Sequence, residues 1–113
     1  MPDVYKRLNT TRTFTSAASA GTQIYPVPAS TTALVKKVVI SNNGGATGTV
    51  KLHHVQSGGS ADSTNVILPT TSLAPNEYGV DDAPFAMSAG DEIRAVGDGT
   101  NAISISIYGL EVS

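Results

Sequence analysis

The segment Ala102-Ile103-Ser104-Ile105-Ser106-Ile107-Tyr108 alternates isoleucine with polar residues from Ile103 onward. In an extended chain, successive side chains point to opposite faces, so the isoleucines share one face and the serines the other. A helix would spread the same isoleucines around its circumference. We therefore predict a half-buried β-strand here.

The rest of the chain repeats this pattern in short segments separated by turn-forming residues. Residues 32–41 are β-branched and apolar on both faces, which is typical of a strand in the middle of a sheet. Within them, Lys36 and Lys37 are adjacent, and a β-bulge is one way to keep both out of the core. Further strands are expected at 23–27, 49–55, 65–68, 79–87 and 92–96. About eight short strands predict an all-β fold, an antiparallel β-sandwich or jelly roll.

Several turns are predicted from Gly, Asn and Pro. Asn42-Asn43-Gly44-Gly45 favours a type I′ hairpin, because Asn and Gly tolerate positive φ, so residues 49–55 are expected to return beside the preceding strand. Pro69 is expected to close the strand at 65–68. Other turns are predicted at 74–76, 89–91 and 97–99.

The beginning of the chain differs in composition. We divide the chain into an extended N-terminal arm at 1–22 and a β-sandwich domain at 23–113. The arm is rich in Thr, Ser and Ala, so it buries little surface on its own. One interpretation is a frayed terminus or an extra edge strand. The other is an arm that orders against a partner by strand addition, with these apolar residues as its partner-binding contacts: Val4, Tyr5, Leu8 and Phe14.

The composition argues against several classes of function. A chain of 113 residues with net charge −2 is expected to be one domain that does not bind nucleic acid, because it lacks concentrated positive charge. Without cysteine it has no disulfide and no thiolate metal site. No run approaches the about 20 apolar residues of a membrane span, and the first twenty residues are not a secretory signal. We expect a soluble protein, assembled in a cytoplasm, whose low charge tolerates contact with its own copies.

Catalytic patterns are not apparent. His53 and His54 are adjacent on a predicted strand, so their side chains point to opposite faces. We expect His54 on the inner face as a packed or hydrogen-bonded residue, and His53 exposed. Residues 97–102 match the letters of a dinucleotide fingerprint, but that motif must open a helix, and a strand follows here.

We therefore expect no enzyme activity, no cofactor and no metal site. A structural calcium stays open, because carboxylates gather in the later loops and calcium prefers oxygen ligands. These carboxylates are Glu77, Asp81, Asp82, Asp91 and Glu92.

A cadence of sequence blocks runs from Gln23 to Val112. The blocks are IYPVPA at 24–29, TALVKKVVISN at 32–42, GTVKL at 48–52, SGGS at 57–60, LAPNE at 73–77 and SAGDEIRA at 88–95. In this order they resemble a group of small β-sandwich structural proteins of tailed bacteriophage particles. The resemblance leaves the arm unmatched.

The resemblance implies a virion role and supplies no catalytic residues. The leading interpretation is a capsid decoration (cement) protein, with a homotrimer favoured. It would sit where major capsid subunits meet, with the arm lying across its neighbours. The alternatives are a neck or tail accessory protein and a glycan-binding module. Two Phe, four Tyr and no Trp argue against the glycan-binding module, because sugars are commonly gripped by exposed aromatic faces.

Overall fold

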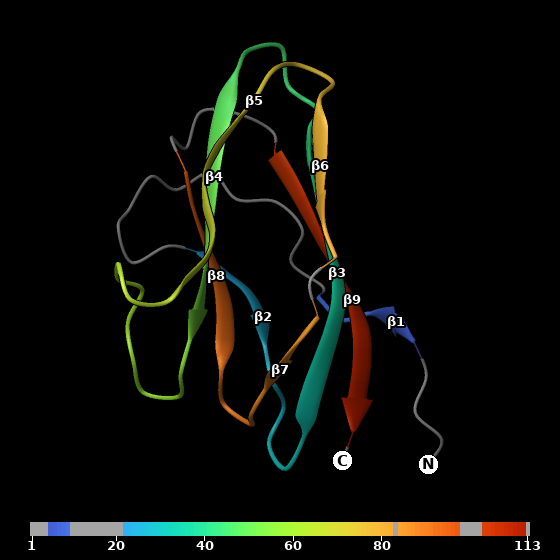
Figure 1. The fold of residues 1–113 in the computed structure, drawn as a ribbon, viewed down its shortest axis with the longest axis vertical. Coiled ribbons are helices and arrows are strands. Elements are labelled where there is room, and N and C mark those ends of the chain that lie inside the picture. The colour runs from blue at the N-terminus through green and yellow to red at the C-terminus, as the bar shows by residue number, and fades with distance from the viewer. Residues whose placement is uncertain (1–4, 10–21, 83, 98–102, 113) are drawn as a thin grey trace.

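A computed structural model describes residues 5–9, 22–82, 84–97 and 103–112. In these parts of the chain all regular structure is β-strand, and Figure 1 shows the strands in two layers side by side. The strands are β1 (Lys6–Arg7), β2 (Thr22–Pro26), β3 (Thr32–Asn42), β4 (Gly48–Val55), β5 (Val66–Leu73), β6 (Tyr78–Asp81), β7 (Phe85–Met87), β8 (Glu92–Gly97) and β9 (Ile103–Val112). No helix that could cross a bilayer occurs among the residues described.

The strands form two antiparallel sheets, named here by a central strand of each. The β9 sheet has the order β1-β9-β3-β6, with β7 also paired to β3, and the β8 sheet has the order β2-β8-β4-β5. Because β6 and β7 pair with successive parts of β3, they act as one interrupted strand. The pairs β1–β9, β2–β8, β3–β6/β7 and β4–β5 are nested, as in a hairpin rolled into two sheets. This is jelly-roll topology, so the predicted fold class is confirmed.

The core lies between the sheets and follows the predicted alternation. Ile103, Ile105 and Ile107 of β9 are at most 2% exposed. They face residues of the β8 sheet such as Leu52 and Ile93, which are fully buried. Glu92 and Arg94 are half-buried, so the alternation predicted for 92–96 is also confirmed.

The bulge suggested by Lys36 and Lys37 is present. The register between β3 and β9 shifts between Val35 and Lys37, and both lysines are exposed. An extra residue on β3 therefore keeps Val35 and Val38 in the core without burying a charge.

The hairpin predicted at residues 42–45 is wrong. β3 and β4 lie in different sheets, so the turn crosses between layers. Asn42 is fully buried; its side-chain amide donates to the carbonyls of Ala46 and Leu73 at 2.9 Å, and its oxygen accepts from the N–H of Gly44. The asparagine thus favours a side-chain-capped turn, and neither Asn43 nor Gly44 has the positive φ that the central residues of a type I′ turn require.

The strand predicted at 65–68 does not end at Pro69. β5 continues to Leu73, and it is an edge strand, where a missing N–H costs no ladder hydrogen bond. Positive φ at Asn76 and Gly90 confirms the turns at 74–76 and 89–91. Most of the turn predicted at 97–99 lies outside the described residues.

Candidate association surface

The sandwich has two sides at which an edge strand of one sheet lies opposite an edge strand of the other: the β1–β2 side and the β5–β6 side. The β1–β2 side is closed by side chains. Leu8 follows β1 and is 9% exposed in the core cluster. Asn9 is 2% exposed; its amide donates to the carbonyl of Ile105 at 2.8 Å and its oxygen accepts from the N–H of Ile107 at 2.9 Å. Asn9 therefore takes the place of a pairing strand on this stretch of β9.

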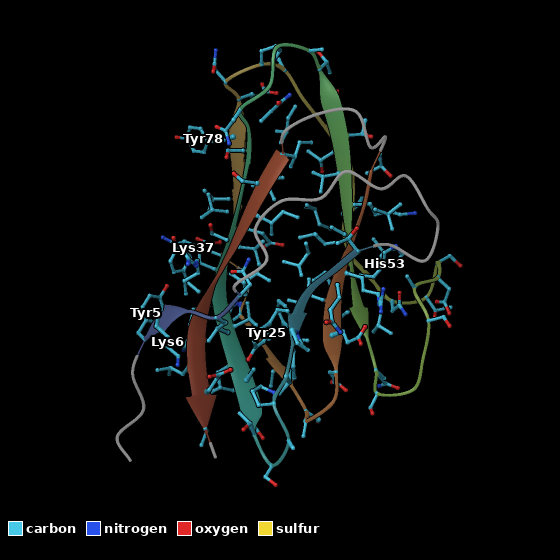
Figure 2. All side chains as sticks on the ribbon, turned by 180° about the vertical axis from the view of Figure 1, so that it is seen from behind. Tyr5, Lys6, Tyr25, Lys37, His53 and Tyr78 are labelled. Atoms are coloured by element: carbon cyan, nitrogen blue, oxygen red, sulfur yellow. The ribbon has the colours of Figure 1, made fainter. Side chains whose placement is uncertain are left out.

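Tyr25 closes the same side from the opposite sheet. Its hydroxyl on β2 donates to a carboxylate oxygen of Glu111 on β9 at 2.6 Å, and Figure 2 shows the ring between the sheets. Burial, with the hydrogen bond to and the charge of Glu111, raises the pKa of Tyr25 well above its usual value. The phenol therefore stays neutral and joins the two sheets.

The β5–β6 side is open. A groove of about 220 Å³ runs between these two edge strands. Its lining is mostly apolar, and comprises Val38, Ile40, Leu68, Thr71, Gly79, Val80 and Asp81. Val38 and Ile40 are core residues, whereas Leu68 is half-buried and Val80 is 51% exposed. The core therefore reaches the surface along this groove, and the buried hydrogen bond from Asn42 to Leu73 links the two sheets at the end of β5.

Exposed large apolar side chains gather at the edges of the β9 sheet. Among the described residues they are Tyr5 at 53%, Tyr78 at 71% and Val80 at 51%. Figure 2 shows Tyr5 and Tyr78 projecting on the same outer side of this sheet. Tyr78 and Val80 are neighbours on one face of β6, and adjacent exposed apolar groups mark association surfaces more often than isolated ones.

The two edges carry opposite charges. Lys6 and Arg7 of β1 are both exposed, although Lys6 also contacts Glu111 at 3.4 Å. At the other edge, Asp81 ends β6 and the exposed Asp82 follows it. The β9 sheet is therefore basic at one edge and acidic at the other.

A second hollow, of about 500 Å³, is polar. It lies between β4, β5 and the loop 56–65, and is lined by His54, Gln56, Gly59, Ser60, Asp62, Thr64, Asn65, Val66 and Ile67. Asn65 accepts from the N–H of Asp62 and donates to the carbonyl of Ser60. Hydrogen bonds from Thr64 lower the pKa of Asp62. These polar groups hold the loop together, and no Tyr, Trp or Phe ring lines the hollow.

The prediction that His53 is exposed is wrong. His53 is 2% exposed, and its Nδ1 lies 2.7 Å from the side-chain oxygen of Asn65 in the loop that follows β4. The loop folds back over the histidine, and strand alternation alone does not reveal such a cover. His54 is hydrogen-bonded, as expected: its Nε2 lies 2.9 Å from Asp91, and its ring packs on Phe85 of the opposite sheet.

Asp91 ties the turn before β8 to the end of β4. Burial opposes its ionisation, but hydrogen bonds from His54 and from the N–H groups of Ser88 and Ser57 outweigh this, so the pKa of Asp91 is lowered. The carboxylate is thus a structural acceptor. No cluster of three potential metal ligands occurs in the described parts of the chain, so the residues there offer no ready site for the calcium left open above.

The predicted partner-binding residues that the structure describes differ in their exposure to solvent. Tyr5 is exposed at the β1 edge, whereas Leu8 is buried in the core of its own sandwich. Val4 and Phe14 lie outside the described residues, as does most of the proposed arm. Partner binding by these residues and the boundary at 22/23 stay predictions. The sequence analysis missed Tyr78 and Val80, whose signal was their alternation with Gly79 and Asp81 on a short strand.

Comparison with known proteins gives matches in structure but none in sequence. No family model matches the chain, and no curated protein matches it. Among solved structures it is similar to the coat protein of Tobacco streak virus, at 12% identity and a TM-score of 0.47 over 98% of this chain and 85% of that one. A second structure, the dimer of that coat protein, matches at 11% identity and a TM-score of 0.44, covering 100% and 88%. Values this low establish no relationship, and the fold assignment rests on the strand pairing above.

Proposed function

We propose that this chain is a structural component of a tailed-phage virion, a decoration protein that binds where major capsid subunits meet. The observation that carries the proposal is the cadence of blocks between residues 23 and 112. Those blocks fall on β2–β3, the start of β4, the turn before β6 and the start of β8. They are thus distributed over both sheets and do not form one local motif.

The physical character of the molecule supports a holding role. The two sheets enclose a continuous core, which makes the sandwich a stiff body for carrying contacts. The net charge of −2 and the charged fraction of 14% leave little repulsion between closely packed copies. On a symmetric lattice, many weak contacts give durable attachment through avidity.

Counting copies in purified particles tests the proposal. Mass spectrometry of virions from the phage that encodes the chain should find it in hundreds of copies, in fixed ratio to the major capsid protein. A few to a few dozen copies would place it in a neck or tail ring. Its absence from virions would contradict the proposal, and specific binding on a glycan array would then favour the glycan-binding alternative.

Point substitutions are needed to test whether the N-terminal arm anchors the protein to capsids. Deleting the first twenty residues would remove Leu8 and Asn9 from the sandwich as well as the arm. Val4→Ser and Phe14→Ser leave those two residues in place. If the arm anchors the protein, both variants should co-sediment less with capsids than the wild type, and unchanged binding would exclude these contacts.

A further inference from the structure

The β9 sheet has two edges that pair with nothing on their outer sides among the described residues. At one end β1 pairs only with β9, and at the other β6 pairs only with β3. The outward N–H and C=O groups of an edge strand are a template for another strand. Natural sheets usually protect such edges, and here each carries an exposed aromatic residue beside it, Tyr5 or Tyr78.

The two edges match each other in direction. β1 is antiparallel to β9, β9 to β3, and β3 to β6, so β1 and β6 run in opposite directions. A second copy in the same orientation would therefore present its β1 antiparallel to the β6 of the first. The alternating order of the sheet would continue across the contact.

The side chains also match face by face. Arg7 pairs with Tyr108 and points to the outer face of the sheet. Tyr5, two residues earlier on the same strand edge, points to the same face. Val80 pairs with Val39 and lies on the same outer face as Tyr78, while Asp81 lines the groove on the inner side. The rings of Tyr5 and Tyr78 would meet outside.

The charges match on the inner side. The ammonium group of Lys6, which contacts Glu111, would approach the carboxylate of Asp81. Pairing two β1 edges would instead bring Lys6 and Arg7 against their own copies, and pairing two β6 edges would oppose the aspartates. Like charges directly opposite are destabilising, so the unlike edges are the favoured pair.

We propose that copies of this chain associate head-to-tail, the β1 edge of one adding to the β6 edge of the next and covering its apolar groove. The strand that pairs with the β6 edge beside the groove comes from a second copy of this chain, because one chain supplies both complementary edges. A heterologous contact of this kind closes into a ring or grows into a filament, depending on its rotation. The inference deepens the proposed function, in which copies assemble on a particle, by naming the contact between them.

Two variants and their mixture test this contact. Val80→Glu places a carboxylate on the β6 edge, and Tyr5→Glu places one on the β1 edge; both positions are exposed, so the fold should persist. Gln56→Glu, in the exposed loop, adds the same charge away from both edges and is the control. Circular dichroism verifies folding, and Tyr5→Ser replaces Tyr5→Glu if that variant unfolds.

Sedimentation velocity at increasing concentration gives the readout. The wild type and Gln56→Glu should self-associate, and each edge variant should dissociate about tenfold more readily, a loss of about 1.4 kcal/mol. An equimolar mixture of the edge variants should form a one-to-one heterodimer and nothing larger, since each retains one intact edge. A monomeric wild type, or an edge variant that assembles like the control, overturns the inference.

The two proposals fail separately. If the chain stays monomeric but occurs in virions, the head-to-tail contact is wrong and the virion role stands. If the contact forms but virions lack the chain, the virion role is wrong and the contact stands.

Discussion

The β1–β2 and β5–β6 sides of the sandwich solve the same problem in different ways. Each must end two sheets without leaving core residues exposed to water. The first side does so with Leu8, the double hydrogen bond of Asn9, and the link from Tyr25 to Glu111. The second has a buried hydrogen bond from Asn42 to Leu73 where β5 ends, but leaves a groove over Val38 and Ile40. The difference supports the proposal that copies of the chain associate at the β5–β6 side.

The largest effect on stability should come from removing the two hydrogen bonds that the Asn9 side chain makes to β9. Asn9→Ala leaves the buried carbonyl of Ile105 and the N–H of Ile107 without their side-chain partner. Losing both should destabilise the fold by about 2–4 kcal/mol in urea unfolding. Asn43→Ala is the matched control, because Asn43 is exposed and donates to the hydroxyl of Ser104. Equal stability of the two variants would contradict a clasp at Asn9.

Truncating one leucine on each side compares the sides directly. Leu8 is 9% exposed within the core, whereas Leu68 is half-buried at the groove. We expect Leu8→Ala to cost about 2 kcal/mol, the lower end for buried leucine, and Leu68→Ala about 1 kcal/mol. The same urea titrations measure both values. A larger loss at Leu68 would show that the open side is as well packed as the closed one.

Asn9 also shows where sequence reasoning reaches its limit. The alternation of β9 and the bulge at Lys36 and Lys37 were predictable, because both follow from the two-residue period of a strand and the cost of burying charge. The bonds from Asn9 to β9 join residues 96 and 98 positions apart. No local pattern marks which polar residue will reach that far.

Two errors have the same origin. Local turn chemistry at Asn42 favours a hairpin, whereas its amide bonds to Leu73, a residue from another strand. Strand alternation predicts His53 at the surface, whereas the returning loop covers it and Asn65 of that loop hydrogen-bonds to it. The open edge at Tyr78 and Val80 could have been noticed, since both are large and apolar on a short strand.

A smaller effect is expected at Tyr25. Tyr25→Phe removes the hydroxyl bond to Glu111 and should cost about 1 kcal/mol near neutral pH. Because the pKa of Tyr25 is raised on folding, the neutral phenol stabilises the protein fully below pH of about 10, and this stability is lost as pH rises further. From pH 8 upward, the free energy of unfolding should therefore fall less steeply with pH for the phenylalanine variant than for the wild type. Identical slopes would argue against the link between the sheets.

The smallest expected effect is on stability at acidic pH and comes from Asp91. The lowered pKa of Asp91 means that its ionised form stabilises the fold above the unfolded value of about 4, and that this contribution is lost as pH falls through the acid range. Asp91→Asn should therefore show a flatter stability profile than the wild type between neutral pH and pH 3. Thermal unfolding at several pH values measures this. An unchanged profile would mean that His54 and the two N–H donors do not favour the carboxylate.

Hydrogen exchange read by mass spectrometry tests the contrast between the two sides most directly. The amides of Tyr78–Asp81 that point away from β3 should exchange quickly in dilute solution and slow down as concentration rises, together with the outward amides of Lys6–Arg7. Amides of β3, which has partner strands on both sides within one chain, should stay slow throughout. Exchange at Tyr78–Asp81 that does not respond to concentration would contradict the assignment of the open side to association.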